Sequence, residues 1–242
     1  MYIKIVQKYK KHLMDVHNIS FLHFFYNGII KGIHPPVGLS LNIFVCVFII
    51  YVHLHLQKPI MKEIYLAGGC FWGTEHYFKQ MNGVISTETG FANGKTENPT
   101  YEEVYTDTTG FAETVKVVYD ERRISLRFLI DMFFHAIDPT LVNRQGHDVG
   151  TRYRTGVYYV EETDRAVIEA VFQEKQKQYA DPIVTELEPL LNYYPASEYH
   201  QDYLDKHPDG YCHLPVELFR FAKEATESAG VSKMARIWRS GF

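Results

Sequence analysis

The alternation of apolar and polar positions predicts a chain of interleaved strands and helices between residues 61 and 214. Short apolar or strictly alternating runs are typical of strands, whereas apolar residues that recur every three or four positions are typical of helices. The expected strands are 64–67, 84–91, 113–120, 155–160 and 183–190. The expected helices are 75–81, 101–105, 125–137, 164–179 and 196–206.

This order of elements contains a βαββαβ unit, the split-βαβ arrangement, which packs its helices on one face of a sheet. We therefore predict an α+β fold, a two-layer α/β sandwich with a ferredoxin-like core and a mixed sheet. The C-terminal segment is expected to be long and rich in coil. The loop at 138–151 is long for a compact domain, and such loops tend to be functional when ordered. A helix at 217–228 is expected to be an appended, solvated element.

The first 60 residues differ in character from the rest. The nearly uniformly apolar run from Leu39 to Val52 is shorter than the about 20 residues that a membrane span needs. It could be a signal anchor, a hydrophobic extension, or upstream sequence read from a start codon assigned too early. Met61 directly precedes the first strand, which favours the last of these. We therefore predict an extension at 1–60, one main domain at 61–214 and a helical tail at 215–242. The expected location is cytoplasmic, with a membrane anchor through Leu39 to Val52 as the alternative.

Composition narrows the class of protein. Of the 242 residues, 46% are hydrophobic and 22% are charged, which is typical of a globular protein. The net charge of −4 gives no reason to expect nucleic-acid binding. The cysteines are Cys46, Cys70 and Cys212, and their odd number and spacing match neither a disulfide scaffold nor a zinc or thioredoxin-like Cys-x-x-Cys motif. No metal and no cofactor are expected.

Cys70 lies where a buried strand is expected to turn into a helix, directly after Gly68 and Gly69. Glycines let a substrate approach the backbone closely. The partial positive charge at a helix N-terminus lowers the pKa of a thiol. The position thus suits a nucleophilic thiolate, but a buried structural cysteine beside aromatic residues fits it equally well.

The residues around Cys70 resemble a known family. The sequence Gly-Cys-Phe-Trp-Gly at 69–73 is similar to the signature of the A-type peptide methionine sulfoxide reductases. Further blocks at 90–94, 98–104, 146–154 and 207–213 resemble that family's blocks in the same order. Together they cover about residues 61–214, the whole of the predicted main domain.

The resemblance implies that Cys70 is the nucleophile of a sulfoxide reduction. A sulfoxide has an electrophilic sulfur and a basic oxygen, so its reduction needs a soft nucleophile and a proton donor. By resemblance the donor is Glu113, whose pKa burial would raise toward neutrality. Tyr101 and Tyr153 match tyrosines that hydrogen-bond the sulfoxide oxygen. The predicted substrate-binding residues are Phe71 and Trp72, which would surround the S-methyl group, and Asp148, which would orient the pocket.

The family's cycle also implies a way to restore the thiol. Attack leaves a sulfenic acid on Cys70, which Cys212 would resolve to a disulfide that thioredoxin reduces. The implied substrates are proteins and peptides that carry methionine sulfoxide, and free methionine sulfoxide, so the role would be repair after oxidative damage. We expect a monomer with no nucleic-acid partner, and a membrane partner only if residues 1–60 form a real anchor. Two positions depart from the usual pattern, Phe111 where the family commonly has histidine and Tyr105 where it often has cysteine.

Other classes of function stay open on the sequence alone. A Cys-His hydrolase could use Cys70 with one of the 12 histidines, although no hydrolase motif supports it. A thiol redox sensor would form the Cys70–Cys212 disulfide with peroxide but would show no turnover. A membrane-anchored interaction protein has support from residues 1–60 alone.

Overall fold

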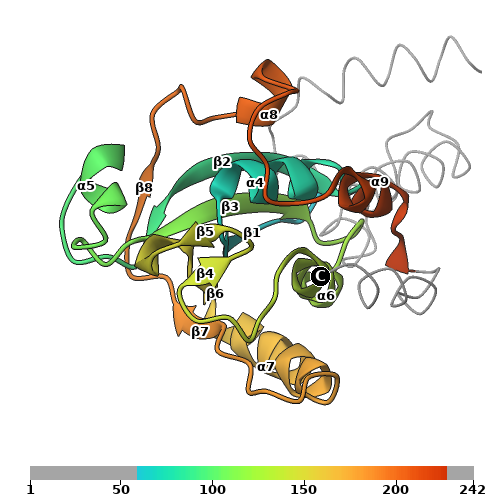
Figure 1. Cartoon of the computed structure of the whole chain (residues 1–242). Helices are drawn as coiled ribbons and strands as arrows, with labels where there is room; N and C mark the ends of the chain where they lie inside the picture. Colours follow the sequence, from blue (N-terminus) through green and yellow to red (C-terminus); the bar gives the residue numbers. More distant parts are fainter. Residues whose placement is uncertain (1–58, 228–242) are drawn as a thin grey trace, which may run out of the picture. The chain divides into compact units, whose positions relative to one another are not determined.

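The computed structural model describes residues 59–227, which surround a six-stranded sheet of order β7-β6-β1-β3-β2-β8 (Figure 1). Neighbouring strands are antiparallel except for the parallel pair β6 and β7, so the sheet is mixed. The four central strands β6-β1-β3-β2 have the order of a split-βαβ unit, which confirms the predicted fold class. The strands are β1 (Met61–Gly68), β2 (Val84–Ala92), β3 (Ala112–Asp120), β6 (Thr155–Tyr159), β7 (Glu186–Pro189) and β8 (Tyr193–Pro195).

Helices cover the sheet, and one of them, α6, begins at a side-chain cap that the sequence predicts. Helix α4 packs on β2 and β3, while α6 packs on β1 and against α7. The hydroxyl of Ser125 accepts a hydrogen bond from the Phe128 backbone N–H, as expected for the residue that caps α6. The helices are α4 (Phe71–Lys79), α5 (Tyr101–Tyr105), α6 (Leu126–Ala136), α7 (Glu162–Gln176), α8 (Tyr203–Lys206) and α9 (Val216–Glu224), with a 3-10 turn η1 (Thr151–Tyr153).

Side chains alternate between the two faces of the sheet. Those on the face covered by helices form a large core, and those on the opposite face form a small cluster. In β1, Ile64 and Leu66 are fully buried in the main core. Their neighbours Tyr65 and Ala67 point to the opposite face and pack with Tyr158 of β6. Because both faces of β1 are buried, the strand occupies the middle of the sheet, between β6 and β3. Its C-terminal end leads into α4.

Two segments fold differently from the prediction. The expected helix at 196–206 is helical only at α8, and the strand β8 before it was not expected. The reason is tertiary, because the side-chain amide of Gln201 pairs with both the N–H and the C=O of Thr89 in β2, each at 2.8 Å. The long loop at 138–151 contains a short hairpin of β4 (Arg144–Gln145) and β5 (Asp148–Val149).

The helix predicted in the tail is present as α9, but the expectation that it is solvated was wrong. Leu218 and Ala222 are 5% and 0% exposed. They join the main core, and α9 contacts α4 and α6. The apolar run from Leu39 to Val52, the rest of residues 1–58, and residues 228–242 lie outside the described residues. Among residues 59–227, no helix combines the length and the apolar character needed to cross a membrane.

Candidate active site

Cys70 is the N-cap residue of α4 and follows directly on the end of β1, as the sequence predicted. Gly69 makes this turn possible with a φ of +84°, a region that side chains disfavour. A Cβ at Gly69 would also lie 2.6 Å from the Cβ of Gln145, a buried residue whose amide binds both backbone groups of Asp138. The hairpin loop therefore packs directly against the backbone that positions Cys70.

Cys70 is 6% exposed, and the pKa of its thiol shifts in the direction opposite to the one predicted. Burial raises the pKa of Cys70 well above its ordinary value, and the charge of Glu113 raises it further. A hydrogen bond from the Trp72 backbone N–H at the start of α4 lowers it, but by less. The cost of removing a thiolate from water thus exceeds the stabilisation from the helix N-terminus. At pH 7 the thiol of Cys70 is therefore neutral.

Glu113 lies near the start of β3 and is 1% exposed. Its Oε2 accepts a hydrogen bond from the Phe71 backbone N–H at 3.0 Å, which places the carboxyl beside the turn that carries Cys70. Burial raises the pKa of Glu113 to about 8, against the lowering effects of the Phe71 N–H and of Arg152. The raised pKa confirms the predicted direction, so at pH 7 this carboxyl is mostly protonated and can donate.

Tyr101 and Tyr153 come from α5 and η1, which meet where the Arg152 guanidinium lies over the rings of Tyr105 and Tyr153. Burial raises the pKa of both phenols, that of Tyr153 to about 12. The next largest contribution to each is the charge of Glu113, and the charge of Cys70 contributes as well. Both hydroxyls therefore stay protonated at neutral pH and lie within electrostatic range of the thiol and the acid.

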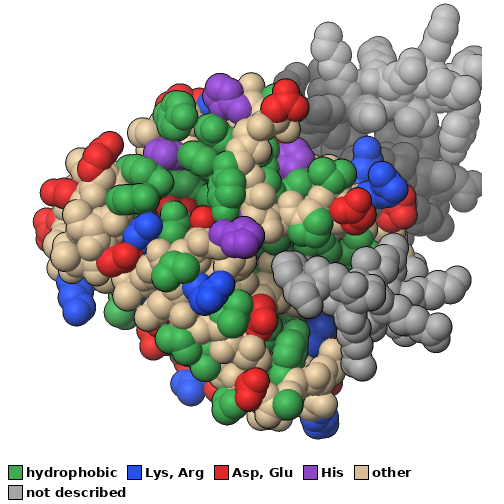
Figure 2. Space-filling view, in the orientation of Figure 1, with side chains coloured by type: hydrophobic (Ala, Val, Ile, Leu, Met, Phe, Trp, Pro, Cys, Tyr) green, Lys and Arg blue, Asp and Glu red, His purple; other side chains and the backbone are tan. Residues whose placement is uncertain are grey.

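Aromatic rings enclose the start of α4. Phe71 is 1% exposed, and its ring centroid lies 6.4 Å from that of Tyr101 and 5.3 Å from the His200 ring. Trp72 is half-buried, stacks on Tyr203 with centroids 3.6 Å apart, and donates its indole N–H to His200 Nδ1 at 3.2 Å. On the face drawn in Figure 2, hydrophobic side chains gather between α5 and α8 with histidines around them.

His200 and Tyr203 were not among the predicted site residues. They belong to the segment that the sequence predicts to be one continuous helix. Helical periodicity is a local signal, so it cannot predict which distant aromatic rings these two side chains contact. Their contacts with Phe71 and Trp72 follow from the return of this segment alongside α4.

The segment 211–213 folds back over the start of α4. The Tyr211 hydroxyl donates to Asp148 Oδ1 at 2.9 Å. The Sγ of Cys212 lies 3.0 Å from where a Cβ on Gly73 would be, so a glycine is what allows this approach. Cys212 is partly exposed, both thiols are free, and the charge of Cys212 contributes to the pKa of Cys70. The tail therefore returns to the site, as the predicted cycle requires.

His213 was not predicted as a site residue, although it follows Cys212 directly. Its Nε2 lies 3.1 Å from the Gly68 carbonyl oxygen. The sulfur of Cys70, a carboxylate oxygen of Asp148 and a ring nitrogen of His213 all lie within 4.8 Å of one another. Sulfur, nitrogen and oxygen at this spacing are the atoms that could hold a divalent transition metal. They are equally the atoms of a Cys-His-Asp group that moves a proton.

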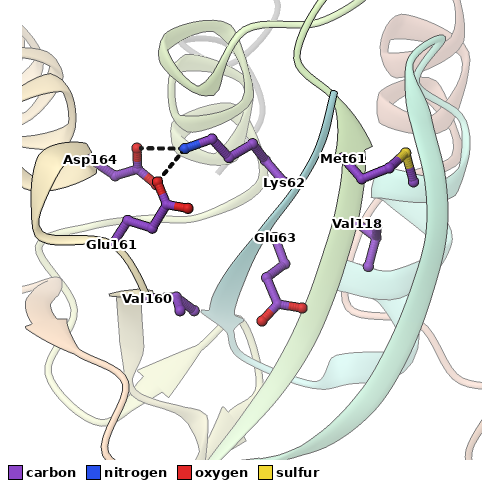
Figure 3. A pocket seen from close by; sticks show the side chains of 7 residues that line it. All are labelled: Met61, Lys62, Glu63, Val118, Val160, Glu161 and Asp164. Atoms are coloured by element: carbon purple, nitrogen blue, oxygen red, sulfur yellow. Dashed lines mark hydrogen bonds and ion pairs between the residues drawn. The ribbon is translucent and has the colours of Figure 1, made fainter. Parts of the chain in front are cut away.

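A separate cavity of about 290 Å³ lies at the other end of β1, around Met61, Lys62 and Glu63 (Figure 3). Lys62, which lines the cavity, is paired with Glu161 and Asp164. Because β1 rises about 3.3 Å per residue, this cavity is roughly 20 Å from Cys70 and takes no part in the site. The residues that the sequence predicted for the site all lie instead near Cys70.

Known proteins resemble this chain over the same region. The family model described as peptide methionine sulfoxide reductase matches residues 62–230. A peptide methionine sulfoxide reductase MsrA from Clostridium acetobutylicum is 57% identical over 160 residues, which are 66% of this chain and 99% of that protein. One of the same name from Clostridium perfringens is 57% identical over 157 residues, 65% of this chain and 100% of that protein.

Two solved structures share the fold. The reduced form of Mxr1 from Saccharomyces cerevisiae is 40% identical, with a TM-score of 0.61, and the match covers 63% of this chain and 88% of that one. Methionine sulfoxide reductase A of Corynebacterium diphtheriae is 38% identical, with a TM-score of 0.58, and the match covers 64% of this chain and 79% of that one.

Proposed function

This chain belongs to the peptide methionine sulfoxide reductase family, and we propose that it reduces methionine-S-sulfoxide in proteins, and free methionine sulfoxide, to methionine. The observation that carries the proposal is the pairing of a buried thiol, Cys70, with a buried carboxyl, Glu113, whose pKa of about 8 keeps it protonated. A nucleophile for sulfur and a proton for oxygen are the two groups that this reaction needs.

In the proposed first step, Cys70 attacks the sulfoxide sulfur as a thiolate. Glu113 donates its proton to the oxygen, while the hydroxyls of Tyr101 and Tyr153 hydrogen-bond that oxygen as negative charge develops on it. Methionine leaves, and Cys70 is oxidised to a sulfenic acid. The raised pKa values of both phenols support this assignment, because only a protonated hydroxyl can donate.

In the proposed second step, Cys212 attacks the sulfenic acid, water leaves, and a disulfide forms. The position of Cys212 beside Gly73, at the start of the helix that Cys70 caps, supports this role. Burial raises the pKa of Cys212, and the Leu214 backbone N–H, which donates to Cys212 Sγ at 3.3 Å, opposes that rise in part. The bond would lie near the surface and exchange with thioredoxin, which we propose as the reductant.

The apolar wall of the site sets the proposed specificity. Phe71 and Trp72 would surround the S-methyl group, since an apolar cage accepts a methyl group and rejects larger alkyl groups and water. Asp148, held by Tyr211, would orient the pocket from the hairpin loop. Phe111, which departs from the family's histidine, packs so closely over Gly94 that a Cβ there would lie 2.2 Å from the ring.

We further propose that residues 61–214 carry the catalytic residues of a cytoplasmic monomer, with 1–60 as an N-terminal extension and 215–242 as a C-terminal tail whose helix α9 packs on the same core. The partners would be oxidised proteins and thioredoxin, and the role would be repair of oxidative damage.

Turnover with the separated S and R epimers of a methionine sulfoxide peptide tests the function directly. With dithiothreitol as reductant, we expect methionine from the S epimer and none above background from the R epimer. The Cys70→Ser variant is the matched control and is expected to be inactive. A thiol redox sensor would form the disulfide with peroxide but release no methionine, and a Cys-His hydrolase would release none either, so either result would refute the proposal.

A further inference from the structure

We propose that His213 accepts the thiol proton of Cys70 at Nδ1 when the sulfoxide is attacked, with the Asp148 carboxylate beside it stabilising the imidazolium that forms. The inference rests on the proposed function and adds to it a proton acceptor, which the cycle described above lacks. It concerns a residue of the tail that neither the sequence patterns nor the resemblance assigned.

The need for an acceptor follows from the burial of Cys70. A neutral thiol must lose its proton before it can attack sulfur. Glu113 cannot take that proton, because the same reaction requires it to arrive protonated and to donate to the oxygen. Tyr101 and Tyr153 are protonated donors as well. An additional base near Sγ is therefore required.

His213 is the described residue that meets this requirement. One of its ring nitrogens lies within 4.8 Å of Cys70 Sγ, a gap that a small side-chain rotation or one water molecule closes. Burial lowers the pKa of His213, so the ring is neutral at pH 7 and free to accept a proton.

The hydrogen bond to Gly68 determines which nitrogen is basic. A carbonyl oxygen only accepts, so Nε2, at 3.1 Å from it, must carry the hydrogen. Nδ1 then has the free lone pair. Within residues 59–227, Nδ1 is shielded from solvent and has no hydrogen-bond partner. A buried, unpartnered acceptor is costly, and it is expected where chemistry uses it.

Asp148 supplies the opposite charge. Its Oδ1 is taken by Tyr211, while Oδ2 is buried and also unpartnered within the described part of the chain. Its charge raises the pKa of His213 against the effect of burial, which is the stabilisation that an imidazolium needs. Within the described residues, the titratable groups around the His213 ring are Cys70 at the start of α4, Asp148 of β5, and Cys212 of its own segment, whose Sγ and the His213 Nδ1 each lie 3.0 Å from where a Cβ on Gly73 would be.

The proposed step balances in protons and electrons. The S–H bond of Cys70 breaks and an N–H bond forms on His213, while Glu113 loses its proton to the sulfoxide oxygen. The sulfur of Cys70 is oxidised by two electrons and the sulfoxide sulfur is reduced by two, so the hydroxyl ends on Cys70 as methionine leaves. Transfer of the imidazolium proton back to Glu113 through water restores both groups, with no net proton consumed.

The test is a single-turnover assay, with enzyme in excess over methionine-S-sulfoxide and no added reductant. The rate of methionine formation is measured between pH 6 and pH 9. The variant is His213→Gln, whose amide can still donate to the Gly68 carbonyl but cannot take a proton. The matched control is His147→Gln, because His147 is an exposed histidine of the nearby hairpin. At pH 7 we expect His213→Gln to be about 100-fold slower and the control to be unchanged.

Two further readouts separate proton transfer from a merely structural role. The deficit of His213→Gln should shrink by about tenfold per pH unit above pH 7, because hydroxide then forms the thiolate directly. Added imidazole should restore the rate of His213→Ala by about tenfold and leave His147→Ala unaffected. A His213→Gln rate within about twofold of the unmodified enzyme, or a deficit that neither pH nor imidazole changes, would overturn the proposal. Because the unmodified enzyme is assayed alongside, absence of methionine there would refute the function itself.

Discussion

Replacing Glu113 with glutamine is expected to make the protein more stable and less active at the same time. Glu113 is 1% exposed and its pKa is raised to about 8 from an ordinary 4.5. In the unfolded chain the carboxyl is ionised above pH 5, whereas in the folded chain it must either hold a proton or be charged in a dry environment. Glutamine removes this cost, and its amide oxygen can still accept the Phe71 N–H.

The size of the effect follows from linkage between protonation and folding. A group whose pKa is raised in the folded state loses stabilisation as the pH rises from its unfolded value through its folded value. At 1.36 kcal/mol per pH unit, the interval from 4.5 to about 8 amounts to about 5 kcal/mol above pH 8 and about 3 kcal/mol at pH 7. Below pH 4.5 both states are protonated and the cost disappears.

The assay is urea denaturation of the reduced protein at pH 5, 7 and 8.5. We expect the free energy of unfolding of Glu113→Gln to exceed that of the unmodified protein by about 1, 3 and 5 kcal/mol in turn. Methionine formation by the variant at pH 7 should fall by about 100-fold, since the amide can hydrogen-bond the oxygen but cannot donate a proton. Glu97→Gln, at an exposed loop position, is the matched control and should change neither quantity.

A stability difference that stays constant between pH 5 and pH 8.5 would show that Glu113 does not titrate in this range. The physical basis for its role as the acid would then be lost. An undiminished rate of methionine formation would contradict that role directly.

Four further changes have expected outcomes. Cys212→Ser should form about one methionine per enzyme with thioredoxin, because the sulfenic acid is left unresolved; quantified methionine checks this. Tyr153→Phe should lower kcat/KM by about 10- to 100-fold through the loss of one oxyanion donor, with circular dichroism unchanged. Gly69→Ala, at a φ of +84° and with Gln145 2.6 Å from the added Cβ, should lower the free energy of unfolding by about 2 kcal/mol or more. Removal of residues 1–60 should preserve kcat/KM.

Each of these has an outcome that contradicts it. Full thioredoxin-driven turnover by Cys212→Ser would mean that another group resolves the sulfenic acid. A Tyr153→Phe variant with unchanged kcat/KM would remove that hydroxyl from the oxygen site. An unaltered unfolding curve for Gly69→Ala would mean that the turn before Cys70 relaxes freely. An insoluble or inactive protein without residues 1–60 would contradict the assignment of that segment to an extension.

Much of the fold follows from short-range patterns in the sequence. The apolar run of β1, the alternation in β3 and the cap at Ser125 each depend on neighbours within a few residues, and all three were predicted correctly. The position of Cys70 at the turn from strand to helix follows from the same local information. The long loop was predicted as functional, although its hairpin was not, because two-residue strands leave no periodicity to detect.

The sequence alone determined the order of the main strands and helices, the family, and the position of a cysteine at the end of the first strand. Only the tertiary structure decided the protonation state of that thiol. The helix N-terminus predicted a lowered pKa for Cys70, and burial together with Glu113, which is 43 positions away, raises it instead. His213, which is 143 positions from Cys70, enters the site in the same way. Capping and periodicity depend on residues close in the sequence. The pKa of a thiol depends on desolvation and on every charge nearby in space, so only the folded chain determines the pKa of Cys70.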